Sequence, residues 1–484
     1  MSFISPQYIV FFAVVVPLYF ALPLSKRWIL LLIASYIFYA FSRVEYVLLI
    51  AFSTLVDYFA ARQLDSTPAT QIGKRRLLLS LSIIVNLTVL FTFKYFNFFN
   101  ESLSTVFAQV GFDYQPITHS LILPVGISFY TFQSMAYTID VYRGRIPVET
   151  NLGIFATYVA FFPQLVAGPI ERAQNLLPQF RQKYKFDYDR VVSGLRLILW
   201  GAFKKVVIAD SAAVYVNKIY NGLPEFTGLP LLLATIFFTF QIYCDFSGYS
   251  DIAIGSARVM GFDLMENFRQ PYLSRSIREF WQRWHISLST WFRDYVYIPL
   301  GGNRSSLARY LFNLMFVFVV SGLWHGSNWT FVIWGTLHGL YIIAEVLYTH
   351  RNKQSMMRDG LLLRWFQQGL TFTLVVFAWI FFRANTLSDA QYVITNMFNF
   401  SRGYAQILHP FLNNPAPKGE FLMLVAVIGF LMLVEIDSVR WNFQKQILKN
   451  PVFRWLIYYL AALIILFNYF RLLDVRPPFI YFQF

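Results

Sequence analysis

Histidine is the side chain best suited to proton transfer near neutral pH, and His325 is the most unusual of the six in this sequence. It lies in an apolar stretch as part of SGLWHG (321–326), and the last charged residue before it is Arg309, sixteen positions earlier. An ionisable side chain at membrane depth is costly and therefore indicates a function. The glycines and Ser321 beside it would allow a helix to break and a cavity to open. Burial favours a neutral imidazole there, which could act as a general base.

The other histidines support weaker predictions. His338 also lies in apolar sequence, but flanking glycines would allow close helix packing, and a hydrogen bond across it would be reason enough for its presence. His285 lies between Trp281 and Leu288, which share its face if the segment is one helix. We interpret the remaining three as solvated residues of loops or helix ends: His119, His350 and His409.

Several kinds of chemistry lack their sequence signatures. The chain has no HExxH or CxxC motif and no dense His/Asp cluster, so we expect no metal site. It also lacks a GxSxG elbow and the glycine patterns of nucleotide-binding loops. Asp245 and Asp251 are six residues apart and would not share a helix face well, so an acid/base pair is doubtful. Pairing of Asp245 with an arginine of 269–304, or capping of a broken helix, fits at least as well.

The composition predicts how these residues are held. Of 484 residues, 57% are hydrophobic and only 13% charged, against about 25% in soluble domains. Apolar runs recur along the whole chain, which predicts an all-α polytopic membrane protein. The single cysteine excludes an intrachain disulfide, and the net charge of +15 is scattered between apolar runs, which suits an anionic membrane surface better than nucleic acid. The expected spans are 8–24, 28–42, 44–61, 77–99, 121–140, 191–216, 229–247, 310–326, 328–349, 363–382, 421–436 and 453–473.

Basic residues indicate the orientation of these spans. They fall in alternate connections near 26, 75 and 144, which places the N-terminus outside and those loops in the cytoplasm. Residues 151–170 are apolar but broken by Pro163, Gly168 and Pro169, so they form either a re-entrant segment or a kinked span. Residues 276–295 predict one amphipathic helix along the cytoplasmic interface or over a funnel, with tryptophans and phenylalanines at helical spacing.

Five stretches, in this order, resemble the membrane-bound O-acyltransferase family over most of the chain: FFPQLVAGPIER (161–172), YCDFSGYSDIAIG (243–255), FWQRWHISLS (280–289), YIPLGGNR (297–304) and SGLWHG (321–326). The chain looks closest to the branch of alginate O-acetyltransferase and the membrane subunit of peptidoglycan O-acetyltransferase, and more distantly resembles the teichoic-acid D-alanyl transfer protein. The resemblance implies a single domain over 1–484, with its core motifs within 120–350 and extra helices in 360–484. It also implies a ring of about 11–12 transmembrane helices around a funnel.

The family's catalytic histidine maps onto His325, and its second signature position maps onto His285. The resemblance implies that His325 removes the proton of an acceptor hydroxyl while a thioester donates its acyl group. Donor and acceptor would reach it from the cytoplasm and from outside, respectively. The oxyanion could be stabilised by His285, Asn328 or the Trp324 indole, and the arginine-rich region could attract donor phosphates. The predicted substrate-binding residues are Trp324, Asn328, Asp245 and Arg304.

These features predict an O-acetyltransferase of the bacterial cytoplasmic (inner) membrane. Its donor substrate would be acetyl-CoA or an acyl-carrier thioester, with no permanently bound cofactor. Its partners would be an extracytoplasmic SGNH-type acetyltransferase or another acceptor protein, a polysaccharide and membrane lipids. The preferred acceptor is an alginate-type exopolysaccharide. Peptidoglycan O-acetylation and D-alanyl transfer to teichoic acid are alternatives, and the segment around 384–420 mildly disfavours the second. A polysaccharide or lipid transporter without chemistry is another, although we detect no internal repeat.

Overall fold

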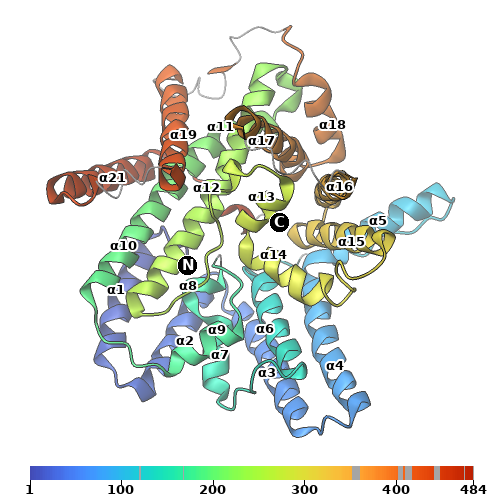
Figure 1. Cartoon of the computed structure of the whole chain (residues 1–484), viewed down its shortest axis with the longest axis vertical. Coiled ribbons are helices and arrows are strands. Elements are labelled where there is room, and N and C mark those ends of the chain that lie inside the picture. The colour runs from blue at the N-terminus through green and yellow to red at the C-terminus, as the bar shows by residue number, and fades with distance from the viewer. Residues whose placement is uncertain are drawn as a thin grey trace. The chain divides into compact units, whose positions relative to one another are not determined.

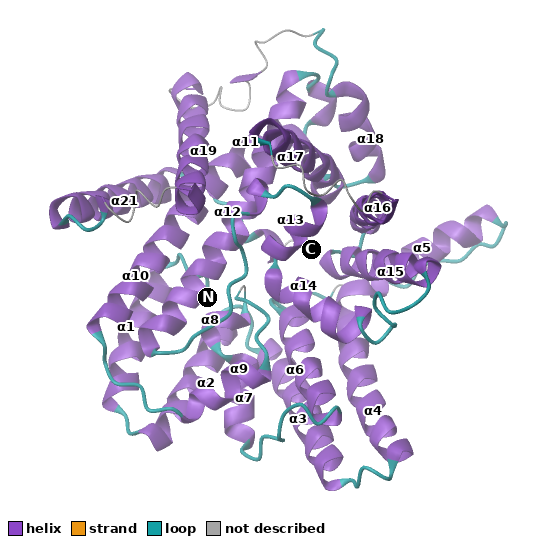
Figure 2. Cartoon of the chain, in the orientation of Figure 1, coloured by secondary structure: helices purple, strands orange, loops and turns teal. Residues whose placement is uncertain are grey.

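The computed structural model describes residues 1–118, 121–166, 168–351, 360–401, 407–408, 417–440, 447–473 and 475–482. All regular secondary structure in these ranges is helical (Figure 2). Eight helices among the described residues are long and apolar enough to cross a membrane. The predicted all-α polytopic membrane protein is thereby confirmed, and the ring around a funnel stays a prediction.

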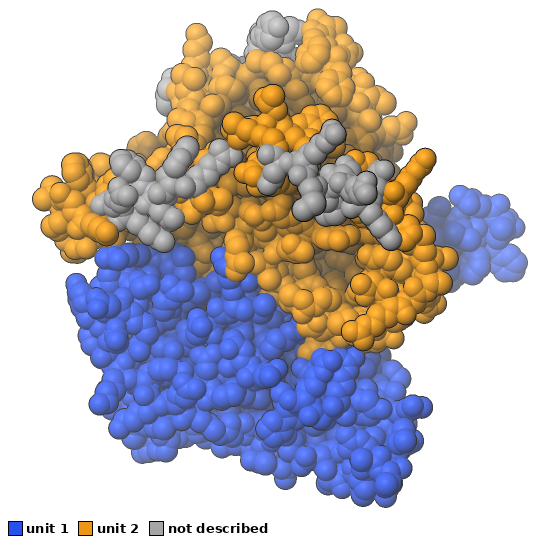
Figure 3. Space-filling view, in the orientation of Figure 1, with its two compact units in different colours: residues 1–198, 252–266 blue, residues 199–251, 267–484 orange. Residues whose placement is uncertain are grey.

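Two units share the described chain, and Figure 3 colours them separately. The first comprises Met1–Ile198 and Ile252–Glu266. Most of the predicted spans in this part correspond to its helices within a few residues, although the span predicted over 121–140 begins only at Ile127. The elements of the first unit are α1 (Pro6–Ala21), α2 (Leu24–Ala40), α3 (Glu45–Ser66), α4 (Ile72–Leu90), η1 (Phe91–Tyr95), α5 (Phe96–Gln109), α6 (Ile127–Tyr142), α7 (Leu152–Ala160), α8 (Phe162–Leu165), α9 (Ala173–Leu176), η2 (Leu177–Arg181) and most of α10 (Tyr188–Ala202).

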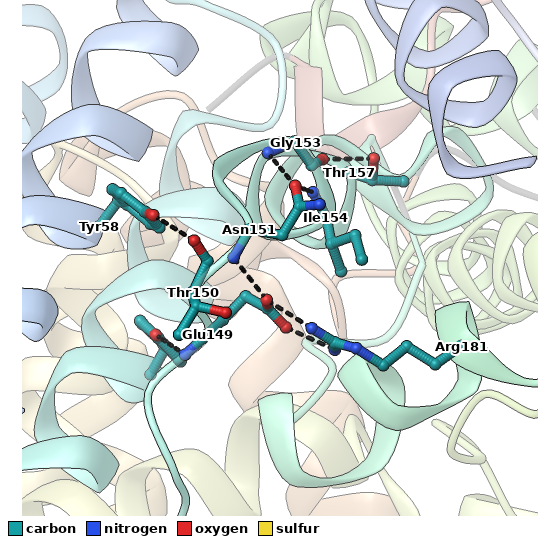
Figure 4. A network of polar contacts seen from close by, with 9 residues as sticks. Tyr58, Glu149, Thr150, Asn151, Gly153, Ile154, Thr157 and Arg181 are labelled. Carbon is teal, nitrogen blue, oxygen red and sulfur yellow. Dashed lines mark hydrogen bonds and ion pairs between the residues drawn. The ribbon is translucent and has the colours of Figure 1, made fainter. Parts of the chain in front are cut away.

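The apolar stretch 151–170 forms two short helices rather than one span. Asn151 begins α7 by accepting the backbone N–H groups of Gly153 and Ile154 (Figure 4). The neighbouring Glu149 carboxylate accepts two 2.6 Å hydrogen bonds from the Arg181 guanidinium and a third from the Asn151 backbone (Figure 4). At about 1.5 Å per residue, the nine residues of α7 are too short to cross a membrane about 30 Å thick. This geometry favours the re-entrant interpretation.

The second unit comprises Leu199–Asp251 and Asn267–Phe484. Helix α12 begins in this unit and runs on into the first, so the polar stretch 241–251 lies inside the helix, where we had expected the span to end at 247. The elements of the second unit are η3 (Phe203–Ala209), α11 (Asp210–Tyr220), η4 (Leu223–Glu225), α12 (Leu229–Met260), η5 (Pro271–Leu273), α13 (Ile277–Arg283), α14 (Ile286–Phe292), η6 (Arg293–Tyr297), α15 (Leu307–His325), α16 (Trp329–Arg351), α17 (Leu361–Arg383), α18 (Leu387–Asn396), α19 (Pro417–Arg440), α21 (Pro451–Arg471) and η9 (Ile480–Phe482) (Figure 1).

The prediction of a single amphipathic helix over 276–295 is wrong. The segment forms α13, α14 and the π-helical turn η6, with a break at His285, whose φ of 45° lies in the left-handed region. A left-handed residue ends an α-helix, so His285 does not share a helical face with Trp281 and Leu288. The aromatic side chains of this segment are packed inside the unit: Trp284 is fully buried, and its ring lies 5.2 Å from that of Trp379 on α17.

Helices α15 and α16 form a closely packed hairpin. A Cβ atom added at Gly322 would lie 2.3 Å from the Phe331 carbonyl oxygen, and one at Gly335 would lie 2.3 Å from the Phe318 carbonyl oxygen. Glycines at these positions therefore let the two backbones touch. The helix does end beside the histidine, as expected, because α15 stops at His325 and α16 begins at Trp329.

Candidate active site

His325 occupies the C-terminal end of α15 and is packed among aromatic rings (the aromatic cluster). The residue is 1% exposed. Its ring centroid lies 4.9 Å from that of Trp334 on α16, 5.5 Å from that of Phe382 on α17 and 5.7 Å from that of Tyr481 in η9. Elements far apart in the sequence therefore meet at this imidazole, and they surround it with low-dielectric material that strengthens any charge interaction formed there.

His285, at the start of α14, belongs to the same aromatic cluster. Its ring centroid lies 6.3 Å from that of His325, and the residue is fully buried. Burial lowers the pKa of His285 to about 3, so its imidazole is neutral at physiological pH. Its left-handed backbone is uncommon for a residue with a side chain, and such conformations cluster at functional sites.

Asn267 determines which nitrogen of His285 carries the proton. The Asn267 Oδ1 atom accepts the backbone N–H of Ser287 at 3.2 Å and the Ser287 hydroxyl at 2.9 Å, which identifies it as the carbonyl oxygen. His285 Nδ1 lies 3.2 Å from the same oxygen and must therefore donate a proton to it. The neutral ring then presents Nε2 as a hydrogen-bond acceptor.

Of the predicted substrate-binding residues, Trp324 is the one that the structure places at the histidines. Its ring centroid lies 5.0 Å from that of His325 and 6.1 Å from that of His285. Asn328 instead donates to the Asn385 carbonyl at 3.0 Å and accepts the Thr330 N–H at 3.0 Å, as a residue at the start of α16. Arg304 is exposed in the loop between η6 and α15.

Asp245 is buried on α12, and its partner is a lysine rather than an arginine of 269–304. Lys205 Nζ lies 2.6 Å from Asp245 and 2.8 Å from Asp210. The backbone N–H of Ile480 donates to the other Asp245 oxygen at 2.7 Å. The second carboxylate of the polar stretch, Asp251, pairs with Lys204 at 2.8 Å. Asp245 thus links α12 to the η9 turn that carries Tyr481.

Comparison with known proteins gives the family of this chain. The family model of MBOAT, membrane-bound O-acyltransferase family, matches residues 145–387, which include the elements that carry both histidines. The chain is 42% identical over 423 residues to "Probable alginate O-acetylase AlgI" of Pseudomonas aeruginosa, covering 87% of this chain and 79% of that protein. It is 43% identical over 384 residues to the protein of that name in Azotobacter vinelandii, covering 79% of this chain and 75% of the relative.

A third relative carries a different name. The chain is 36% identical over 398 residues to "Peptidoglycan O-acetyltransferase" of Helicobacter pylori, with 77% of this chain and 73% of that protein covered. The chain belongs to the membrane-bound O-acyltransferase family. It is therefore a multi-pass membrane enzyme with O-acyltransferase activity, and the resemblance expected from the five motifs is confirmed.

Two residues of the candidate site, Asn267 and Tyr481, carry no signal in the sequence pattern. Asn267 belongs to none of the five motifs, and its hydrogen bond to His285 arises only because a turn returns the chain between α12 and α14. Tyr481 lies 156 positions after His325, and nothing in its local sequence indicates a contact with that ring. The FIYFQF stretch (479–484) is aromatic, but aromatic residues are abundant throughout this chain.

The remaining histidines of the acyltransferase have other environments. Trp281 Nε1 donates a hydrogen bond to His338 Nδ1 at 3.3 Å. Such a hydrogen bond between helices is the structural role that the sequence suggests for His338. His350 is exposed at the end of α16, as expected. His119 and His409 lie outside the described residues. Across the described ranges, no group of three or more His, Cys, Asp or Glu side chains could hold a metal ion.

The arginine-rich region is partly neutralised by the acyltransferase's own carboxylates. Arg283 pairs with Glu279 at 2.6 Å, and Arg293 pairs with Asp294 at 2.8 Å. Arg278 lies 3.6 Å from Glu345 on α16. These pairs reduce the net positive charge of the segment, and Arg304 is exposed to solvent.

Proposed function

We propose that this enzyme is an O-acetyltransferase with His325 as its general base, which passes acetyl groups from a cytoplasmic thioester toward an extracytoplasmic polysaccharide. The observation that carries the proposal is that two imidazoles lie in one buried aromatic cluster, with ring centroids 6.3 Å apart. Two buried imidazoles shielded from water suit proton transfer better than binding of a permanent charge.

The proposed reaction replaces the carbon–sulfur bond of the thioester by a carbon–oxygen ester bond and moves one proton from oxygen to sulfur. The acceptor hydroxyl gives its proton to His325 while its oxygen attacks the thioester carbonyl carbon. The carbon–sulfur bond then breaks, and the proton passes from His325 to the leaving thiolate. A general base in this position contributes roughly 10²- to 10⁴-fold to the rate. Exclusion of water by the surrounding rings would limit hydrolysis of the thioester.

The tautomer of His285 bears on the oxyanion. With Nδ1 donating to Asn267, the neutral ring offers no N–H from Nε2, so His285 fits an accepting role better than an oxyanion-stabilising one. Asn328 is engaged with Asn385 and Thr330. Of the three candidate donors, the Trp324 indole N–H therefore fits best, because its ring lies beside both histidines.

The names of the relatives support O-acetylation of a polysaccharide as the overall reaction. We propose acetyl-CoA or an acyl-carrier thioester as donor substrate, with Arg304 contacting its phosphates. An alginate-type polysaccharide would be the final acceptor, with an extracytoplasmic SGNH-type or other acceptor protein as partner. The enzyme would lie in the bacterial cytoplasmic membrane.

A matched pair of histidine variants tests the proposal. His325→Ala removes the buried base, whereas His350→Ala removes an exposed histidine at the end of α16. We expect polymer-bound acetyl in a complemented deletion strain, measured by mass spectrometry, to fall at least about 100-fold for the first variant and to stay unchanged for the second. Full acetylation by His325→Ala at normal membrane abundance would refute the proposal.

Purified enzyme separates the alternatives. Labelled acetyl-CoA should turn over, and D-alanyl-carrier thioester should not. Turnover of the D-alanyl donor instead would establish D-alanyl transfer. A transporter would consume neither donor, and its histidine variants would change flux rather than acetylation. Acetyl found on peptidoglycan rather than on alginate in the strain would reassign the acceptor.

A further inference from the structure

We infer that Asp245 and Lys205 are positioning residues, which hold residues 476–481 (the docking segment) so that Tyr481 forms a wall of the acyl-transfer site. The inference rests on the proposed function for the identity of that site. It assigns a role to two buried charges on α12 and η3 that the proposed mechanism does not use.

The geometry of η3 brings a lysine to Asp245. This turn is π-helical, and both consecutive lysines in it are buried, Lys204 at 4% and Lys205 at 1% exposure. In a regular α-helix, consecutive side chains point about 100° apart. The wider π turn therefore allows both to face α12, where they reach Asp251 and Asp245. Gly248 allows the close approach, because a Cβ there would lie 2.7 Å from the Gly201 carbonyl oxygen.

The docking segment completes the charge balance of this cluster. Lys205 lies between two carboxylates, Asp210 and Asp245, and all three are almost fully buried. A buried ion without compensation costs several kcal/mol. Arg476 supplies the second positive charge, with Nε 3.5 Å from Asp210. Removing the segment would therefore leave a net negative charge inside the unit.

Two further contacts set the register of the segment. The Ile480 N–H donates to Asp245 at 2.7 Å, which fixes the backbone one residue before Tyr481. Phe479 packs on Tyr249 of α12 with ring centroids 4.4 Å apart. Phe246, on the same helix, lies 4.5 Å from the Tyr481 ring and 4.7 Å from the His285 ring.

The outcome of this docking is the position of one ring. Tyr481 lies 5.7 Å from His325 and 6.3 Å from His285, measured between centroids. Tyr481 therefore lies beside both imidazoles, where its ring would form a wall for an acyl group bound between them. Asp245 and Lys205 would act on the reaction through this ring. Asp245, which we predicted as a substrate-binding residue, contacts the docking segment through the Ile480 N–H.

Two variants disrupt the contact between Asp245 and the docking segment, one from each side. Asp245→Asn removes the charge that faces Lys205, and Ile480→Pro removes the N–H donor. We expect each to lower acetyl transfer about 10- to 100-fold, because a displacement of about 1 Å at a reacting centre has effects of that size. The double variant should be no worse than the more impaired single variant, since both act through one segment. Asp251→Asn is the matched control, because it breaks the Lys204 pair on the same helix and leaves the docking segment in place.

A readout independent of catalysis follows the ring itself. A photoreactive phenylalanine analogue at position 481 should crosslink to α15 in the otherwise unchanged enzyme and in Asp251→Asn. The yield should drop severalfold in Asp245→Asn and Ile480→Pro. Three results would each overturn the inference. The first is normal acetyl transfer by both folded single variants, and the second is a double variant whose loss equals the product of the two single losses. The third is a crosslinking yield that is the same in Asp245→Asn as in the otherwise unchanged enzyme. Failure of the proposed function is distinguishable, because it would appear as full acetylation by His325→Ala.

Discussion

Replacing Gly322 by alanine is expected to separate α15 from α16 and to displace His325. The added Cβ would lie 2.3 Å from the Phe331 carbonyl oxygen, about 1 Å closer than the 3.4 Å at which ordinary van der Waals contact begins. Backbone atoms cannot rotate away as a side chain can, so the helices must part by a similar distance. His325 is three residues further along the same helix and moves with it.

The expected effects are a loss of about 1–3 kcal/mol in stability, typical of overpacking, and a loss of up to about 100-fold in acyl transfer. Purified enzyme in detergent allows both to be measured, by thermal unfolding and by thioester consumption per folded molecule. Gly369→Ala on α17 is the matched control, because nothing lies within 4 Å of the Cβ added there. Normal stability and normal turnover in Gly322→Ala would refute the argument that backbone contact positions the histidine.

Three further outcomes are expected from other contacts. Asn267→Asp places a carboxylate against Nδ1 of His285 and should raise the pKa of that ring from about 3 to about 4–6, so that the pH profile of turnover gains a loss as pH falls through the raised value, which His285 does not cause in wild type. Burial raises the pKa of Glu171 to about 7, so the folded protein binds the extra proton, and its thermal stability should fall as pH rises from about 4.5 to 7. Glu171→Gln should flatten that dependence, and an unchanged slope would contradict the assignment. Asn151→Ala removes the cap of α7 and should cost about 1 kcal/mol in unfolding experiments without changing the pH profile of turnover.

The long apolar helices could be predicted from sequence because each carries its own signal. Runs of apolar residues specify α15, α16 and α17 within a few positions, since a lipid environment demands a helix of a given length. His325 could be identified for the same reason, because an ionisable residue in such a run is conspicuous.

The local geometry around His285 could not be predicted in this way. The aromatic spacing of 276–295 suits one continuous helix, but tertiary packing imposes a left-handed residue in the middle. Asn267 accepts hydrogen bonds from both halves of the resulting turn, at His285 and at Ser287, and helical periodicity does not encode such a contact. The lysine partner of Asp245 was missed for a related reason, because Lys205 reaches Asp245 from a π turn that apolar periodicity does not predict.

The backbone contact between α15 and α16 also limits how the site can move. At Gly322 and Gly335 the two helices are already in backbone contact and cannot move closer together. His325 is therefore part of a rigid helical hairpin. His285 instead lies in the two-residue junction, Trp284 and His285, between two helices of seven residues each. A rotation about that junction would change the separation of the two imidazoles during turnover, with His325 as the fixed reference and His285 as the moving part.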